Sequence, residues 1–145
     1  MASGKGTANS ISYLSLVFQA VTWANVAINA TSGPLTNLYV SLHTSNPGSS
    51  GNQTSNEAAY TSYARVAVAR TTGGWGISST TISNIAAVTF PAATGGSESE
   101  TYVGIGSATS GNGILFWFGQ LTAPLAVSSG ITPSFAIGAL TITES

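Results

Sequence analysis

Few side chains in this sequence can do acid, base or nucleophilic chemistry. The sequence holds a single histidine, His43, and its four acidic residues are all glutamates. A catalytic triad needs a serine or threonine, a histidine and a carboxylate that converge, and the Gly-x-Ser-x-Gly turn that presents such a serine is missing. Because His43 falls opposite the aliphatic side of its predicted strand, we expect it on the surface or capping a turn.

Glu98 and Glu100 are the closest pair of carboxylates in the sequence. They are two residues apart in a predicted strand, so their side chains share one face. Glycosidases use such a pair of carboxylates, and a glycan-cleaving enzyme built on Glu98 and Glu100 is one hypothesis. The other is a solvated strand edge, where negative charge discourages pairing with further strands. We favour the edge and predict no enzyme activity.

The composition gives no indication of a metal or cofactor. The absence of cysteine excludes zinc ribbons, iron–sulfur clusters and thiol nucleophiles. Calcium loops are usually rich in aspartate, which is also absent, and no Gly-x-x-x-x-Gly-Lys phosphate loop occurs. We therefore predict no catalytic, cofactor-binding or metal-binding residues.

The charge of the chain is low and balanced. It has three basic and four acidic residues, a net charge of −1, and only 5% charged residues in all. Such a chain offers no cationic surface to a nucleic acid or to an anionic membrane, and we predict neither partner. We expect Arg65 and Arg70 to meet Glu57, Glu98 or Glu100, because a half-buried charge needs a partner.

The N-terminal segment predicts an arm followed by a helix. Residues 1–9 are too poor in apolar groups to fold alone. From Ser10 to about Ala27, apolar residues recur at helical spacing around most of the circumference. One apolar side can pack on the strands, and the other needs a cover, from the same chain or from a partner. The residues that we assign to an assembly interface are Tyr13, Leu16, Trp23 and Lys5.

The rest of the chain reads as short strands separated by turns. Leu38 to Thr44 alternates aliphatic and polar residues, and residues 45–56 form a neutral loop rich in Gly, Asn and Ser. Seven or eight such strands, with turn signals every eight to twelve residues, predict an antiparallel β-sandwich. One single domain, residues 10–145, follows from the length of 145 residues.

Several details of this sandwich can also be predicted. The strand from Ile114 to Leu121 is apolar on both faces and should be central or doubly covered. Ala59 to Thr71 alternates as a strand does, and Ala123-Pro124 should form a loop. The residues expected in the core include Leu42, Val66, Phe116 and Phe118, with Trp75 closing one end of it.

The ordered set of motifs resembles a family of small bacteriophage virion proteins, described as tail-fibre or minor structural proteins. The segments that carry the resemblance are Ser10–Leu14, Leu38–Gly48, Glu57, Tyr63–Arg65, Phe90–Ala93, Tyr102–Ile105, Gly113–Phe116, Leu121–Pro124 and Leu140–Thr143. Similar small sandwiches of jelly-roll type serve as cement proteins on phage heads.

The resemblance implies a structural part of a phage virion. We expect a capsid cement or decoration protein that stabilises the head through contacts with copies of itself and with the major capsid protein. The trimer that we expect follows from the resemblance to cement proteins alone. The alternative is a tail-fibre or receptor-binding module that recognises the host surface. The loop of residues 45–56 argues against a receptor-binding tip, because it has no aromatic or basic side chain.

Overall fold

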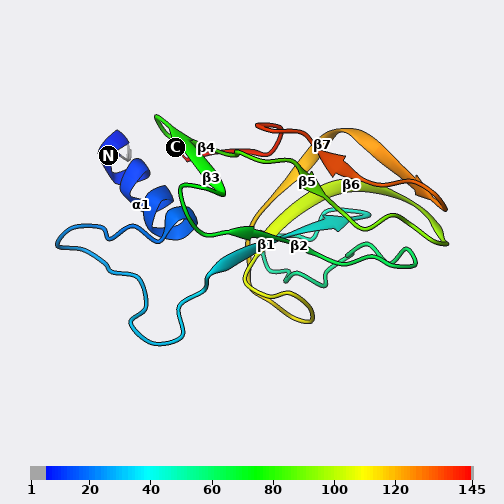
Figure 1. Ribbon diagram of the computed structural model, residues 1–145, viewed down its shortest axis with the longest axis horizontal. Helices are drawn as coiled ribbons and strands as arrows, with labels where there is room; N and C mark the ends of the chain where they lie inside the picture. Colours follow the sequence, from blue (N-terminus) through cyan, green and yellow to red (C-terminus); the bar gives the residue numbers. More distant parts are fainter. Residues whose placement is uncertain (1–5, 145) are drawn as a thin grey trace. The chain divides into compact units, whose positions relative to one another are not determined.

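A computed structural model describes residues 6–144, so the predicted arm, residues 1–9, lies largely outside the described residues. Figure 1 shows the described elements in chain order. They are α1 (Thr7–Gln19), β1 (Asn37–His43), β2 (Val66–Ala69), β3 (Trp75–Ser78), β4 (Thr81–Asn84), β5 (Val88–Thr89), β6 (Ser97–Gly106), β7 (Leu115–Ser128), β8 (Ser134–Phe135) and β9 (Thr141–Thr143).

The protein is mainly β, with antiparallel sheets of sandwich type and a helix near the N-terminus, which confirms the predicted fold class. The sheets have the strand orders β2-β1-β6-β7, β3-β4-β9 and β5-β8. The chain forms two compact units. Unit 1 comprises residues 1–36, 69–87 and 135–145, and unit 2 comprises residues 37–68 and 88–134. The jelly-roll topology and the single domain stay predictions.

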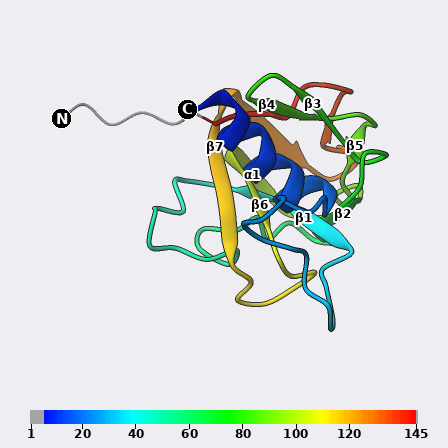
Figure 2. The same cartoon turned by 90° about the vertical axis from the view of Figure 1, so that its left-hand side faces the viewer.

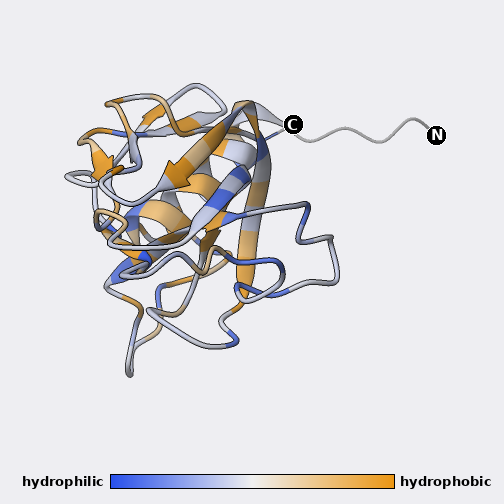
Figure 3. Cartoon of the chain, turned by 90° about the vertical axis from the view of Figure 1, so that its right-hand side faces the viewer, coloured by the Kyte–Doolittle hydropathy of each residue, from blue (hydrophilic) through white to orange (hydrophobic). Residues whose placement is uncertain are grey.

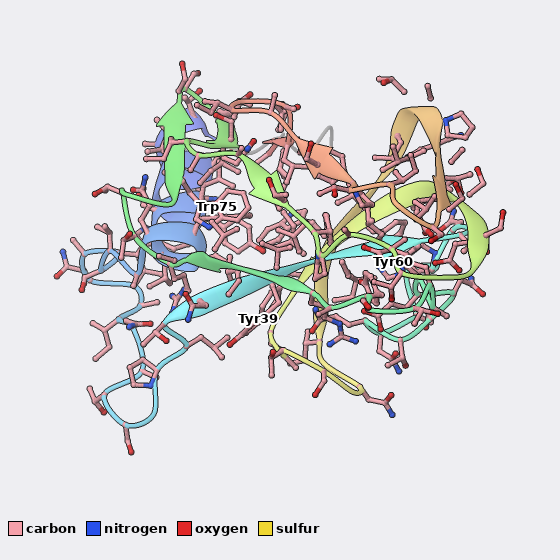
Figure 4. All side chains as sticks on the ribbon, turned by 45° about the vertical axis from the view of Figure 1, so that its right-hand side comes forward. Tyr39, Tyr60 and Trp75 are labelled. Atoms are coloured by element: carbon pink, nitrogen blue, oxygen red, sulfur yellow. The ribbon has the colours of Figure 1, made fainter. Side chains whose placement is uncertain are left out.

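Unit 1 packs α1 with the sheet β3-β4-β9 (Figure 2). Trp75 is fully buried and meets the Phe18 ring edge to face, with 4.9 Å between centroids. Figure 4 shows the Trp75 side chain beside α1. The sequence indicated a chain break at this tryptophan, yet Trp75 begins β3, and its predicted place in the core is confirmed.

Helix α1 is shorter at its C-terminus than the predicted span of residues 10–27. It begins at Thr7, so Ser10 lies inside the helix and is not its N-cap. It ends at Gln19 because Ala20 adopts a left-handed conformation with φ of 57°. The N–H of Val21 then bonds to the Ser15 carbonyl at 3.1 Å, a hydrogen bond that closes helix ends.

Unit 2 is built on β1, which pairs with β6 in antiparallel register, Val40 opposite Ile105. Leu38, Val40 and Leu42 are fully buried, as the alternation of residues 38–44 predicted. The polar face of the same strand is buried too, so the expectation of a surface position for His43 is wrong. The reason is that residues 45–56 fold back over this face and bond to it.

Strand β7 corrects the prediction of a central, doubly covered strand. It is the outer strand of its sheet, and Phe118 is 38% exposed. Figure 3 shows this long strand as largely apolar. The strand also continues through Pro124, where a loop was expected. The proline fits because the pairing of β7 with β6 is irregular there and the outer edge needs no backbone donor.

The strand predicted from Ala59 to Thr71 is reduced to β2, Val66–Ala69. A side chain takes the backbone donors that a longer strand would need. Glu98 Oε1 accepts hydrogen bonds from the N–H groups of Ala59 (2.9 Å) and Tyr60 (2.7 Å). In β2 itself Val66 is only half-buried.

Candidate functional site

Arg70 anchors the long loop that follows α1 in unit 1 (Figure 1). Its guanidinium donates to the carbonyl oxygens of Leu16 (2.5 Å) and Val17 at the end of the helix. It also donates to Asn29 Oδ1 and to the Leu35 carbonyl, both at 2.9 Å. Arg70 is buried, and burial lowers its pKa. This one cation therefore caps the negative end of α1 and fixes the loop at two further points.

The predicted glutamate partner of Arg70 is replaced by these carbonyl and amide oxygens. We call residues 20–35 the apolar loop, because large apolar side chains in it face solvent. Val26 is 67% and Ile28 65% exposed, and Val21 and Leu35 are exposed as well. Inside the loop, Trp23 and Ala27 exchange backbone hydrogen bonds of 2.8 and 3.0 Å. The loop is thus an ordered platform for apolar groups.

The interface residues predicted from sequence lie at or near the base of this loop. Tyr13 and Leu16 on α1 and Trp23 in the turn are each half-buried. Lys5 lies outside the described residues. The exposed residues of the apolar loop were missed because residues 20–27 were assigned to the helix. The available signal was the set of valines and isoleucines within a stretch rich in Asn, Thr and Ser.

A charged network in unit 2 holds the end of the 45–56 loop. Arg65 and Glu57 form a two-pronged ion pair, with N–O distances of 2.6 and 2.7 Å, so one predicted pairing is confirmed. Tyr63 donates its hydroxyl to Glu57 at 2.9 Å. Arg65 also donates to the carbonyls of Ala108 (2.9 Å) and Gly111 (2.8 Å) in the β6–β7 turn. The network links two turns to β1.

His43 and Ser41 form a hydrogen-bonded pair of the kind that activates a serine. His43 Nδ1 bonds to the Ser55 carbonyl at 2.9 Å, so this nitrogen carries the proton. Nε2 then accepts from Ser41 Oγ, also at 2.9 Å. Burial lowers the His43 pKa, and both side chains are fully buried. No substrate can reach them in this arrangement, and the pair instead holds the 45–56 loop on β1.

The carboxyls of Glu98 and Glu100 form the second unusual cluster. Glu100 is fully buried, not on a solvated edge as expected, and neither of its oxygens has a hydrogen-bond partner within residues 6–144. Burial, with the neighbouring Glu98 carboxyl, raises the Glu100 pKa to about 8. Tyr60 (Figure 4) lies in the same region, and burial and the two carboxylates raise its pKa to about 12.

Two larger classes of site can be checked against the described residues. In residues 6–144, no three or more His, Cys, Asp or Glu side chains gather in a group that could hold a metal ion. No helix in this part of the chain has the length and apolar character needed to cross a membrane.

Comparison with known proteins gives one family. The family described as podophage GP4 fiber I protein gp80 matches residues 6–143. The chain belongs to this family. A search of curated proteins found no match.

The family membership confirms the resemblance to small phage virion proteins. The protein is accordingly a structural component of a bacteriophage virion. Because the family is named for a fibre, it favours the fibre alternative over the cement function that we expected first.

Proposed function

We propose that this protein is a subunit of a fibre on the phage tail and that it has a structural role. The observation that carries the proposal is the family match, which spans residues 6–143. The fold agrees with it, since a sheet protein braced by buried side-chain networks suits a rigid virion part.

We propose further that the subunit assembles with copies of itself through the apolar loop. Val26 and Ile28 are mostly exposed on a loop that Arg70 holds in place, so little ordering entropy would be lost on binding. Among the described residues of unit 1, only Arg70 and Glu144 are charged, and Arg70 is buried. A neutral apolar surface of this kind suits a second neutral apolar surface better than a charged partner.

The remaining expectations about partners become part of this proposal. The protein binds no nucleic acid and no membrane directly, in keeping with its net charge of −1. It has no enzymatic role, because the Ser41–His43 pair and Glu100 are sealed from solvent. The trimer stays a prediction, and so does the contact with the major capsid protein, which belongs to the cement hypothesis.

The test is to locate the protein in the particle by cryo-electron microscopy of purified virions. We expect its density in fibres at the tail. Many copies on the head shell, with none at the tail, would overturn the fibre assignment and restore the cement hypothesis. Digestion of host polysaccharide by the purified protein, abolished in Glu100→Gln, would overturn the structural role.

A further inference from the structure

Glu100 is the least satisfied polar side chain of unit 2. It is fully buried, yet both carboxyl oxygens lack a hydrogen-bond partner among the described residues. A buried polar group without a partner carries a large desolvation cost, and native proteins rarely retain one. Such a group commonly marks a place where a bound ion or water completes the structure.

Glu98 is held so that it can complete such a site. It lies two residues before Glu100 in β6, on the same face of the strand. The N–H groups of Ala59 and Tyr60 both donate to Glu98 Oε1, which fixes the carboxylate and leaves Oε2 without a bond among the described residues. Two neighbouring carboxylates repel each other unless a proton or a cation lies between them.

We propose that Glu98 and Glu100 bind a divalent cation with the oxygen preference of calcium. Three oxygens are available, namely Glu98 Oε2 and both oxygens of Glu100. Because calcium takes six to eight oxygen ligands, water and backbone carbonyls must supply the others. So few protein ligands place the affinity in the weak range of extracellular modules, about 10⁻⁴–10⁻³ M. Zinc is disfavoured, because no histidine or cysteine belongs to the cluster.

The competing explanation is that Glu100 is simply a neutral, protonated acid. The two explanations make opposite predictions for the variant Glu100→Gln. Glutamine keeps the shape of the side chain and has no charge. It should abolish cation binding if the site is real, and it should raise the melting temperature without any cation effect if Glu100 is only a buried acid.

The experiment uses terbium, which substitutes for calcium and luminesces when an excited tyrosine lies nearby, as Tyr60 does here. Titration of the purified protein with Tb³⁺ should give saturable luminescence that Ca²⁺ competes away. Calcium should also raise the melting temperature, and EDTA should reverse the rise. Glu98→Gln, which keeps an acceptor for Ala59 and Tyr60, should weaken binding at least about tenfold.

Glu144→Gln is the matched control, because it removes one carboxylate from unit 1 and should leave terbium binding unchanged. Luminescence that is absent, or equal in the wild type and Glu100→Gln, would overturn the proposal. A calcium effect on melting that persists in Glu100→Gln would also overturn it. The site does not depend on the fibre assignment, so either can fail alone.

Discussion

His43 shows how one buried side chain can make the stability of unit 2 depend on pH. Its two ring nitrogens bond to Ser41 and to the Ser55 carbonyl, and neither can accept a further proton without losing a contact or gaining a buried charge. Burial lowers the His43 pKa below its ordinary value of 6.5. The coulombic effects of Glu57 and Arg65 on this ring oppose each other.

We therefore expect the free energy of unfolding to depend on His43 below pH 6.5. The unfolded chain binds a proton near pH 6.5 and the folded chain does not, so this contribution is present above pH 6.5 and is lost as the pH falls. The loss is at most about 1.4 kcal/mol per pH unit. Urea unfolding of the wild type and His43→Gln at several pH values measures it as a difference. That difference removes the opposite slope that Glu100 gives both proteins. Parallel curves would contradict the prediction.

The ion pair of Arg65 and Glu57 should make a large contribution in a single-partner deletion. The side chains are 2% and 15% exposed, so removal of one charge leaves the other poorly solvated. We expect Glu57→Ala to lower the free energy of unfolding by about 3–5 kcal/mol. Glu144→Ala is the control and should change it by less than about 0.5 kcal/mol. Equal effects of the two substitutions in urea unfolding would show that the network is dispensable.

At the scale of elements, Phe18 on α1 and Phe118 on β7 offer a matched comparison. Phe18 is fully buried against Trp75, whereas Phe118 is 38% exposed on an outer strand. We expect Phe18→Ala to cost about 3–5 kcal/mol, and Phe118→Ala to cost about 1 kcal/mol or less. Thermal unfolding of the two variants under dilute conditions measures both. A larger loss in Phe118→Ala would mean that β7 is more central than its place in the sheet indicates.

The same comparison shows what sequence patterns can and cannot predict. Alternation identified the buried face of β1, because the period of two is a property of the strand itself. Alternation is silent about what covers the opposite face, so the burial of His43 and Glu100 could not be predicted. Phe118 was placed in the core because an apolar run looks the same in a central strand and in an outer strand.

Arg70 and the apolar loop illustrate the same limit for the candidate site. Helical spacing continues past Gln19, and nothing nearby in sequence shows that a guanidinium from residue 70 ends the helix. A contact between residues so distant in sequence cannot be inferred from local patterns. The need for an exposed, neutral interface could be predicted from composition, whereas the residues that form it could not.

Arg70→Lys tests whether the anchor is needed. A lysine ammonium is a compact charge and cannot bond to four oxygens spread over the helix end and the loop. We expect backbone amides of residues 20–36 to exchange with deuterium at least about tenfold faster in Arg70→Lys, as local opening becomes easier. Hydrogen exchange with mass spectrometry measures this. Thr132→Ala, in an exposed turn of unit 2, is the control. Unchanged exchange in the loop would show that the loop is held by other contacts.

At the scale of the whole molecule, the low charge sets how copies of the protein can associate. Only 5% of residues are charged, and both arginines are buried in hydrogen-bonded networks. Long-range charge attraction between subunits is therefore weak. Contacts between neutral apolar surfaces such as the apolar loop depend on removing that surface from water, which added salt does not screen.

We accordingly expect self-association to resist salt. Raising the sodium chloride concentration about tenfold should change the apparent dissociation constant by no more than about threefold. Ammonium sulfate should strengthen association, because sulfate is excluded from protein surfaces and favours apolar burial. Sedimentation velocity over a range of protein concentrations measures both effects. Val26→Lys should weaken association through the loss of an apolar contact and the burial of a charge, and Thr132→Lys is the control for added charge. Dissociation by sodium chloride in the wild type would instead show that ion pairs hold the subunits together.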